Sequence, residues 1–258
     1  MKTIPLTPQH RDGSRLSAEL HLPERDIRGV ALLLHGLLSS QRSSTNTTLI
    51  PILNDASIAS LSFDFMGHGD SDGELKDICI SSGVEGVSAT LTATREHFPN
   101  MASFPLVVFG SSFGGAVALA SAPYMSPCGV VLKSPALDIA GFQRQIRGDA
   151  IMQQWKEDGV LSLPEFGPDI ALSYRFISDS LGYDSYTLAQ ACSCSFAIVH
   201  GTVDEAVTVE QSRRLALLLG DRCRFLEIDS GDHRFSRPED FTHALDFCAA
   251  SIIDMMQS

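Results

Sequence analysis

The sequence has few basic residues and no long apolar segment. Of its 258 residues, 19 are Lys or Arg and 31 are Asp or Glu, so the formal net charge is -12 at pH 7. Nucleic acids and anionic membranes bind proteins through clusters of basic side chains, and the chain has no such cluster. No apolar run approaches the roughly 20 residues that a membrane-spanning helix needs. We therefore expect no nucleic-acid partner and no membrane span.

Cysteine is too scarce for a disulfide-stabilised protein, with six residues in the whole chain. Cys192 and Cys194 could form a metal or redox pair, but no further ligands flank them, and a redox pair usually has two intervening residues. The other four are expected to be small buried apolar groups: Cys79, Cys128, Cys223 and Cys248. Residues 1–10 lack the apolar core of a secretory signal. We expect a reduced, cytoplasmic protein with no metal ion and no cofactor.

Apolar segments and helical segments alternate along most of the chain. Residues 1–23 predict an antiparallel hairpin, with strands at 2–6 and 15–22 and a turn at Asp12-Gly13. Further strands are expected at 30–34, 60–65, 105–109, 129–133, 195–199 and 223–228, and helices at 43–54, 82–98, 113–121, 208–219 and 239–255. This alternation favours right-handed crossovers and a mostly parallel, doubly wound α/β sheet. A chain of this length can bury its core as one domain, so we expect residues 1–258 to form a single domain.

The most informative segment is 107–116, VVFGSSFGGA. An apolar strand ends there in Gly-x-Ser-x-Gly, and small helix-forming residues follow, which is the pattern of a nucleophile elbow. Such a turn strains the backbone of Ser112, and the glycines two positions either side let neighbouring segments approach closely. Ser112 is therefore the candidate nucleophile. The alternative is a glycine-rich turn whose serine only caps the helix.

A serine hydroxyl needs a base and an orienting acid to act as a nucleophile at neutral pH. Two candidates follow predicted strands downstream of Ser112: Asp204 comes after the strand at 195–199, and His233 comes after the strand at 223–228. Because the carboxyl ends of parallel strands share one edge of a sheet, the three side chains are expected to meet there. His233 would take the Ser112 proton, and Asp204 would hold the imidazole in the required tautomer.

Each of these residues also has a simpler explanation when taken alone. His233 could be a solvated loop histidine, and Asp204 could cap the helix at 208–219. Asp138, which follows the strand at 129–133, is a rival for the acid. What favours the catalytic interpretation is the joint pattern, in which serine, acid and histidine follow one another in the order used by α/β enzymes of this type.

An oxyanion site is expected beside the candidate nucleophile. The strand at 30–34 ends in a His-Gly pair, and the backbone N–H of the following Leu37 could face a carbonyl oxygen together with the N–H of Phe113. Two such donors would lower the activation barrier by on the order of several kcal/mol. His35 and His200, which each precede a glycine, are expected to be structural and hydrogen-bonded within their turns.

The chain resembles the α/β-hydrolase family over almost its whole length. The matching motifs are HG at 35–36, FDFMGHGDSDG at 63–73, GSSFG at 110–114, HGTVD at 200–204 and GDH at 231–233. Residues 67–73 and a small insertion are most similar to microbial cinnamoyl (feruloyl) esterases and to monoacylglycerol-lipase-like serine hydrolases. In such relatives the acid commonly follows a strand as His-Gly-x-x-Asp, which favours Asp204 over Asp138. Met66 and Thr208 stand where relatives often carry arginine and proline.

The strand and helix alternation breaks over about 135–191, where the resemblance implies a lid insertion. A lid would exclude water and supply an apolar pocket. The candidate wall residues are Trp155, Phe142, Phe166, Tyr174 and Phe176. The alternative is that about half of them form the core of the lid itself. A buried Tyr174 hydroxyl would need a polar partner, and a phenolic substrate could be that partner.

These observations predict a serine hydrolase that cleaves small-molecule carboxylic esters through an acyl-enzyme intermediate. A thioesterase, an acyltransferase or a small peptidase would pass through the same intermediate and stays as the alternative. A binding protein that has kept the fold and lost turnover is a second class of function, which an intact triad argues against. The sequence does not indicate the oligomeric state. The preference for an acyl group and an alcohol would depend on the shape of the substrate pocket.

Overall fold

An eight-stranded sheet forms the centre of the molecule. The computed structural model describes residues 1–257. The spatial order is β1 (Lys2–Leu6), β2 (Ala18–Leu22), β4 (Ile58–Phe63), β3 (Gly29–Leu34), β5 (Leu106–Ser111), β6 (Gly129–Lys133), β9 (Ser195–Gly201) and β10 (Cys223–Ile228). β2 pairs antiparallel with both β1 and β4, and all other neighbours are parallel. The predicted doubly wound sheet with an N-terminal hairpin is confirmed.

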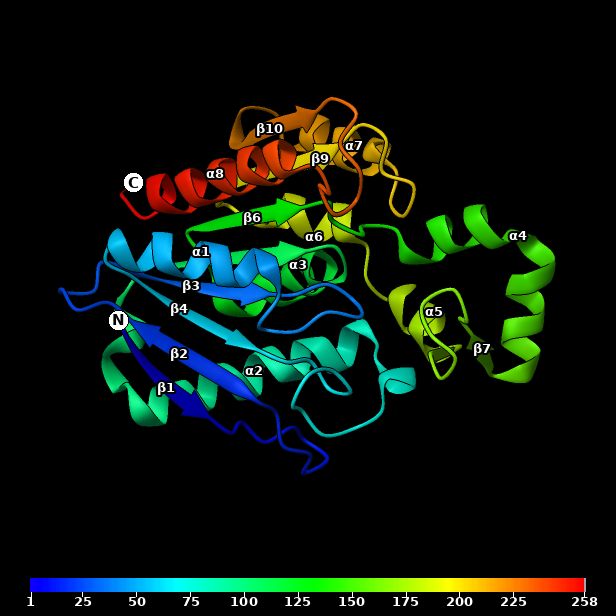
Figure 1. The fold of residues 1–258 in the computed structure, drawn as a ribbon, viewed down its shortest axis with the longest axis horizontal. Helices are drawn as coiled ribbons and strands as arrows, with labels where there is room; N and C mark the ends of the chain where they lie inside the picture. The colour runs from blue at the N-terminus through cyan, green and yellow to red at the C-terminus, as the bar shows by residue number, and fades with distance from the viewer. Residues whose placement is uncertain (258) are drawn as a thin grey trace.

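Helices cover both faces of this sheet (Figure 1). One face is covered by α1 (Ser44–Asp55) and α8 (Pro238–Met255), and the other by α2 (Ile80–His97), α3 (Phe113–Met125) and α7 (Val209–Leu219). Leu32 and Leu34 belong to one hydrophobic cluster, whereas Ala31 and Leu33 belong to the other, because successive side chains of a strand point to opposite faces. This two-sided burial explains the uninterrupted apolar runs in the sequence. Within residues 1–257, no helix is both long and apolar enough to cross a membrane.

The N-terminal hairpin has a shorter second strand and a wider loop than predicted. β2 begins at Ala18 and not at Arg15, although the expected turn is present, with φ of 89° at Gly13. Arg15 forms an isolated antiparallel bridge with Gln9 and also contacts the loop that follows β4. Its backbone N–H donates to a carboxylate oxygen of Asp72 at 2.9 Å, and the N–H of Asp72 donates to the Arg15 carbonyl oxygen at 2.9 Å. The bridge between Gln9 and Arg15 is therefore separate from the β1–β2 ladder, which spans residues 2–6 and 18–22.

The segment that broke the alternation contains a long helix that the sequence did not predict. It consists of α4 (Ile139–Asp158), the two-stranded β7 (Val160–Ser162) and β8 (Ala171–Ser173), α5 (Arg175–Ser180) and α6 (Ser185–Ala191). Few side chains of α4 are buried, among them Met152 and Trp155, so its sequence carries no clear apolar period. Gly148, with φ of 79°, interrupts the helical backbone. In Figure 1, α4, β7 and α5 project beyond the carboxyl ends of the parallel strands.

The start of α3 packs against the end of β3 without room for a side chain. At Gly114, in the first turn of α3, a Cβ atom would overlap the backbone carbonyl oxygens of Leu34 and His35. Backbone atoms cannot turn aside as a flexible side chain can, so any substitution there forces two chain segments apart.

We expect Gly114→Ala to lower the free energy of unfolding by about 1–3 kcal/mol, because the added methyl overpacks this contact. Alanine has the better helix propensity, by about 1 kcal/mol, so a helix effect alone would raise stability. Urea denaturation would measure the change. Tyr124→Ala, at an 83% exposed position of the same helix, is the control and should change stability little. A Gly114→Ala protein as stable as the unsubstituted protein would contradict the close approach.

Candidate active site

Ser112 lies at the turn between β5 and α3, in a backbone conformation that serine rarely adopts. Its φ is 52° and its ψ is -115°. A non-glycine residue with such a backbone stores about 1–3 kcal/mol of strain, which the surrounding structure must hold. Gly110 makes the turn feasible, because a side chain there would overlap the backbone of Gly114. The Ser112 side chain is thereby presented at the carboxyl edge of the sheet, beside the N-terminus of α3.

His233 connects Ser112 to Asp204. Its Nε2 atom lies 3.0 Å from Oγ of Ser112, and its Nδ1 atom lies 2.7 Å from Oδ2 of Asp204. An ionised carboxylate only accepts hydrogen bonds, so we assign the ring proton to Nδ1, which leaves Nε2 free to accept the Ser112 proton. The His233 side chain is 23% exposed and the Asp204 side chain is fully buried. The structure thus brings together the three residues that the sequence indicated.

Asp204 is held as a carboxylate by its neighbours. Burial alone would raise its pKa, but hydrogen bonds from His200 and His233 outweigh this and hold the pKa well below its usual range. The second oxygen, Oδ1, accepts the backbone N–H groups of Ala206 at 2.9 Å and Val207 at 2.8 Å. Both oxygens are therefore fixed, and the negative charge is positioned to orient His233.

Asp138, the rival acid, has a different role in the structure. It is the N-cap residue of α4, where its carboxylate accepts the backbone N–H of Gly141 at 2.8 Å. Its own N–H donates to Oε1 of Gln211 at 2.9 Å. Asp138 is exposed and makes no hydrogen bond with His233, so the geometry favours Asp204 as the partner of that histidine.

The two amides expected to bind an oxyanion are available as donors. Among the hydrogen bonds of residues 1–257, the backbone N–H groups of Leu37 and Phe113 donate to no protein acceptor. Phe113 is the first residue of α3, where the helix dipole also favours negative charge. Gly36, just before Leu37, lies against the Ser112 side chain, since a Cβ atom there would be 3.3 Å from the Ser112 Cβ. The two amides therefore flank the candidate nucleophile.

Two buried histidines brace the loop that carries Leu37. Nε2 of His35 accepts the backbone N–H of Phe65 at 3.1 Å, and its Nδ1 lies 2.8 Å from the Gly36 carbonyl oxygen. Nε2 of His68 accepts the N–H of Leu38 at 3.2 Å. Burial lowers the pKa of His35 to about 3 and also lowers the pKa of His68, so both rings are neutral and can accept these bonds. The structural role expected of His35 agrees with this geometry, whereas the role of His68 was not predicted.

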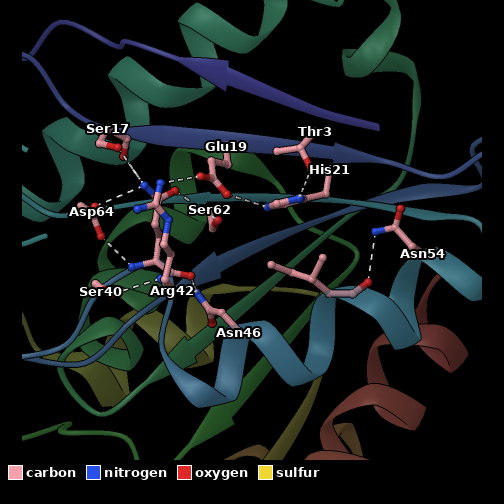
Figure 2. Close-up of polar contacts among 12 residues, drawn as sticks. Thr3, Ser17, Glu19, His21, Ser40, Arg42, Asn46, Asn54, Ser62 and Asp64 are labelled. Atoms are coloured by element: carbon pink, nitrogen blue, oxygen red, sulfur yellow. Dashed lines mark hydrogen bonds and ion pairs between the residues drawn. The ribbon is translucent and has the colours of Figure 1, made fainter. Parts of the chain in front are cut away.

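A buried carboxylate anchors the far end of the same loop, as Figure 2 shows. Asp64 accepts the backbone N–H of Gln41 at 2.6 Å and the backbone N–H of Asp70 at 3.0 Å. Beside it, Arg42 donates to Glu19 at 2.9 Å (Figure 2). Arg42 also donates to Asp70 at 3.1 Å. The sequence showed only the glycine-rich motif at 63–73. Its acidic residues fix the loop after β3 to the loop after β4.

The aromatic residues predicted to line a pocket differ in their surroundings. Trp155 is buried, its Nε1–H donates to the Leu172 carbonyl oxygen at 2.9 Å, and Tyr174 packs edge-on against its ring at 6.1 Å. Phe176 is buried with its ring 5.9 Å from that of Phe113. Trp155 and Phe176 therefore take part in the hydrophobic core. Of the other two residues, Phe142 is partly buried and Phe166 is 53% exposed.

The described residues include no metal-binding cluster, and the two neighbouring cysteines Cys192 and Cys194 are protonated thiols. Within residues 1–257, no group of three or more His, Cys, Asp or Glu side chains is placed to hold a metal ion. Cys192 and Cys194 are free thiols, and burial raises the pKa of Cys194 to about 11. A thiol with a raised pKa is a poor ligand and a poor nucleophile, because both roles need the thiolate.

Comparison with known proteins identifies the family. The family model for serine aminopeptidases of the S33 type matches residues 25–164, which is more than half of the chain. The chain belongs to this family. It is an α/β hydrolase, and the resemblance noted in its sequence is confirmed. No curated protein sequence matches the chain.

Solved structures share the fold of this S33-family chain at low sequence identity. A putative hydrolase from Agrobacterium vitis S4 has a TM-score of 0.81 at 24% identity, covering 99% of this chain and 98% of that one. Est1E from Butyrivibrio proteoclasticus with bound ferulic acid has a TM-score of 0.78 at 19% identity, covering 96% and 98%. A Paleococcus ferrophilus monoacylglycerol lipase has a TM-score of 0.74 at 20% identity, covering 93% and 99%.

The neutral state of His35 makes the stability of this hydrolase depend on pH. In the folded protein its pKa is about 3, against 6.5 as the ordinary value, so on acidification the unfolded chain gains a proton before the folded one does. Its contribution is complete above about pH 6.5 and is lost as the pH falls toward 3. Between pH 6.5 and pH 5 this should cost about 1–2 kcal/mol of unfolding free energy.

His35→Gln removes the titrating group and should reduce this loss. Urea denaturation of both proteins at pH 7, 6 and 5 would measure the difference, and other acid-sensitive groups cancel in the comparison. If the two proteins lost stability in parallel, His35 would not be a buried neutral brace.

Proposed function

We propose that this hydrolase cleaves carboxylic esters with Ser112 as nucleophile, His233 as base and Asp204 as orienting acid. The observation that carries the proposal is the position of His233, 3.0 Å from Oγ of Ser112 and 2.7 Å from Oδ2 of Asp204. A serine and a base within hydrogen-bond reach, with the base oriented by a third group, is the arrangement that nucleophilic catalysis needs.

In the first half of the reaction, Oγ of Ser112 attacks the acyl carbon of the ester while its proton moves to Nε2 of His233. The carbonyl oxygen becomes an oxyanion that the N–H groups of Leu37 and Phe113 would receive. Each such donor is worth about 3–4 kcal/mol in the transition state. His233 then gives its proton to the departing alcohol, which leaves an acyl group on Ser112.

In the second half, water attacks the acyl-enzyme with His233 as base. The acid product then departs, and the Ser112 hydroxyl is regenerated. Asp204 stabilises the imidazolium that forms twice in each cycle. Its low pKa keeps it ionised throughout, because the hydrogen bonds from His200 and His233 outweigh its burial.

The segment 135–191 is proposed to act as a lid over this site. Its elements α4, β7 and α5 project beyond the carboxyl ends of the strands that precede Ser112, Asp204 and His233, whereas α6 packs beside α3. Phe176 of α5 lies against Phe113, the residue next to Ser112, so the segment reaches the site. Partly buried Phe142 and Tyr174 come from the same segment and would supply apolar surface to a substrate. The single-domain organisation with this insertion is part of the same proposal.

Two observations favour esters, and the same triad could also cleave thioesters or amides. Est1E, which shares the fold, binds ferulic acid, and another protein of the same fold is a monoacylglycerol lipase. The family description, in contrast, names an aminopeptidase. A panel of nitrophenyl esters of increasing chain length, hydroxycinnamate methyl esters, acyl-CoA and aminoacyl amides would separate these classes. We also propose that the protein works in the reducing cytoplasm, because all six of its cysteines are free thiols.

Replacement of Ser112 tests the nucleophile. Ser112→Ala should abolish labelling by a fluorophosphonate probe and reduce ester hydrolysis by about 10³-fold or more, because the acyl-enzyme cannot form. Ser111→Ala is the control, since Ser111 ends β5 beside Ser112 and makes no hydrogen bond with His233. It should keep most of the activity and the labelling. Folded protein that is not labelled at Ser112 would favour a binding protein over an enzyme.

Replacement of the two aspartates tests the acid. Asp204→Asn should reduce kcat by about 10³–10⁴-fold, because an amide cannot hold His233 in the same tautomer or stabilise its charge. Asp138→Asn should leave activity nearly unchanged, since asparagine caps a helix as well as aspartate does. Steady-state hydrolysis of a nitrophenyl ester would measure both. A large loss in Asp138→Asn with little loss in Asp204→Asn would overturn the assignment.

A further inference from the structure

A second histidine, His200, contacts the same oxygen of Asp204 as His233 does. His200 lies in β9 and is completely buried. Its Nε2 atom is 2.9 Å from Oδ2 of Asp204, the same oxygen that accepts from His233, and 2.9 Å from the Val207 carbonyl oxygen. Its Nδ1 atom is 2.7 Å from Oγ of Ser212, in the first turns of α7. Asp204 thus stands between two histidines, each of which also contacts a serine.

The contacts of His200 decide where its proton lies. Nε2 faces two oxygens that can only accept, the Asp204 carboxylate and the Val207 carbonyl, so we assign the ring proton to Nε2. Nδ1 then carries a lone pair, which accepts the hydroxyl proton of Ser212. His200 therefore donates to Asp204 as a ring whose far side is itself fixed by a hydroxyl group.

We propose that His200 and Ser212 are positioning residues for the reaction, which hold Asp204 in line with His233 and share its negative charge. The proposal rests on the function proposed above. The hydrogen-bonded chain runs from Ser112 through His233, Asp204 and His200 to Ser212. No proton needs to pass along the far half. His200 acts on the substrate only through Asp204.

The geometry gives His200 two effects on Asp204. The first is orientation, because the amides of Ala206 and Val207 hold only Oδ1, whereas Oδ2 is held against rotation by His200. The second is electrostatic, because a donor on Oδ2 reduces the charge that this oxygen presents to His233. Without His200, Asp204 would attract the His233 proton more strongly, and His233 would become protonated at a higher pH.

Other charged groups lie near the hydrogen-bonded chain from Ser112 to Ser212, and they remain when His200 is replaced. Lys133 at the end of β6 is buried and interacts with Asp204, Asp232 and Arg234, and burial lowers its pKa to about 8. Glu227 on β10 interacts with His200 and forms an ion pair with Arg213. Titration of Lys133 would affect the basic side of a pH profile, so the acid limb is the informative one.

The decisive pair of variants is His200→Phe and His200→Gln. Phenylalanine fills the space of the ring and removes the N–H donor. Glutamine places an amide N–H near the position of Nε2 and so restores the donor. We expect His200→Phe to lower kcat by about tenfold to hundredfold, the factor for losing one hydrogen bond to a charged group, with KM little changed. The acid limb of kcat should move to higher pH, and His200→Gln should recover much of both.

His21→Phe is the matched control for replacing a buried histidine. His21 is 6% exposed on β2, and its Nδ1 is 3.0 Å from Oγ1 of Thr3 (Figure 2). Its Nε2 atom lies 3.3 Å from Oε2 of Glu19, and neither of its contacts involves a residue of the proposed triad. This variant should change stability without moving the acid limb. Ser212→Ala, which leaves His200 in place, should give a smaller shift in the same direction as His200→Phe.

NMR titration of the His233 ring gives a second readout that does not require turnover. Its midpoint in His200→Phe should lie at higher pH than in the unsubstituted protein. A midpoint and an acid limb that stay in place or move the other way would overturn the proposal, as would a folded His200→Gln protein no more active than His200→Phe. If the unsubstituted protein neither hydrolyses esters nor reacts with a fluorophosphonate, the proposed function fails, whereas the titration still tests His200.

Discussion

The strained backbone at Ser112 is the constraint on which the rest of the site depends. A serine with φ of 52° is stable only where β5, α3 and the end of β3 approach so closely that Gly110 and Gly114 can carry no side chains. The cost of about 1–3 kcal/mol is small beside the burial of the strands on both sides. Because this close contact also sets where the chain leaves β3, it places Leu37 and Ser112 next to each other. The proposed nucleophile and one of the two proposed oxyanion donors are thus positioned by the same backbone contact.

The other site loops are fixed by polar contacts where the sheet ends. The carboxyl ends of parallel strands lie at one edge of the sheet. The loops that follow them lack the backbone hydrogen bonds of the sheet, which would otherwise fix their conformation. In each loop a buried polar side chain takes over this role. Asp64 and His68 hold the loop after β3, and Asp204 holds its own loop through the amides of Ala206 and Val207. Buried polar groups cost stability unless they are hydrogen-bonded, so these contacts also select one loop conformation.

The sequence was most informative where burial follows a simple rule. β6 occupies the predicted residues because a strand buried on both faces is an uninterrupted apolar run. β10 also occupies the predicted residues, although it lies at the edge of the sheet with Arg224 and Glu227 exposed. The meeting of Ser112, Asp204 and His233 could be predicted because each residue follows a parallel strand, and the carboxyl ends of parallel strands share one edge of the sheet. By contrast, α4 was missed because little of it is buried. The contacts of His68 and His200 depend on partners brought close by folding, such as Leu38 and Ser212, and a single sequence does not reveal these partners.

The histidines near Ser112 differ in their burial and in the groups that their ring nitrogens contact. The reaction proposed here needs one imidazole to gain and lose a proton, and His233 is the one with 23% of its side chain exposed and a carboxylate on Nδ1. His35 and His68 are buried, burial lowers the pKa of each, and each accepts a backbone N–H. A proton on either ring would break the bond that holds the Leu37 loop. Because both pKa values are lowered, the two rings stay neutral near neutral pH and hold the loop of Leu37, one of the two proposed oxyanion donors.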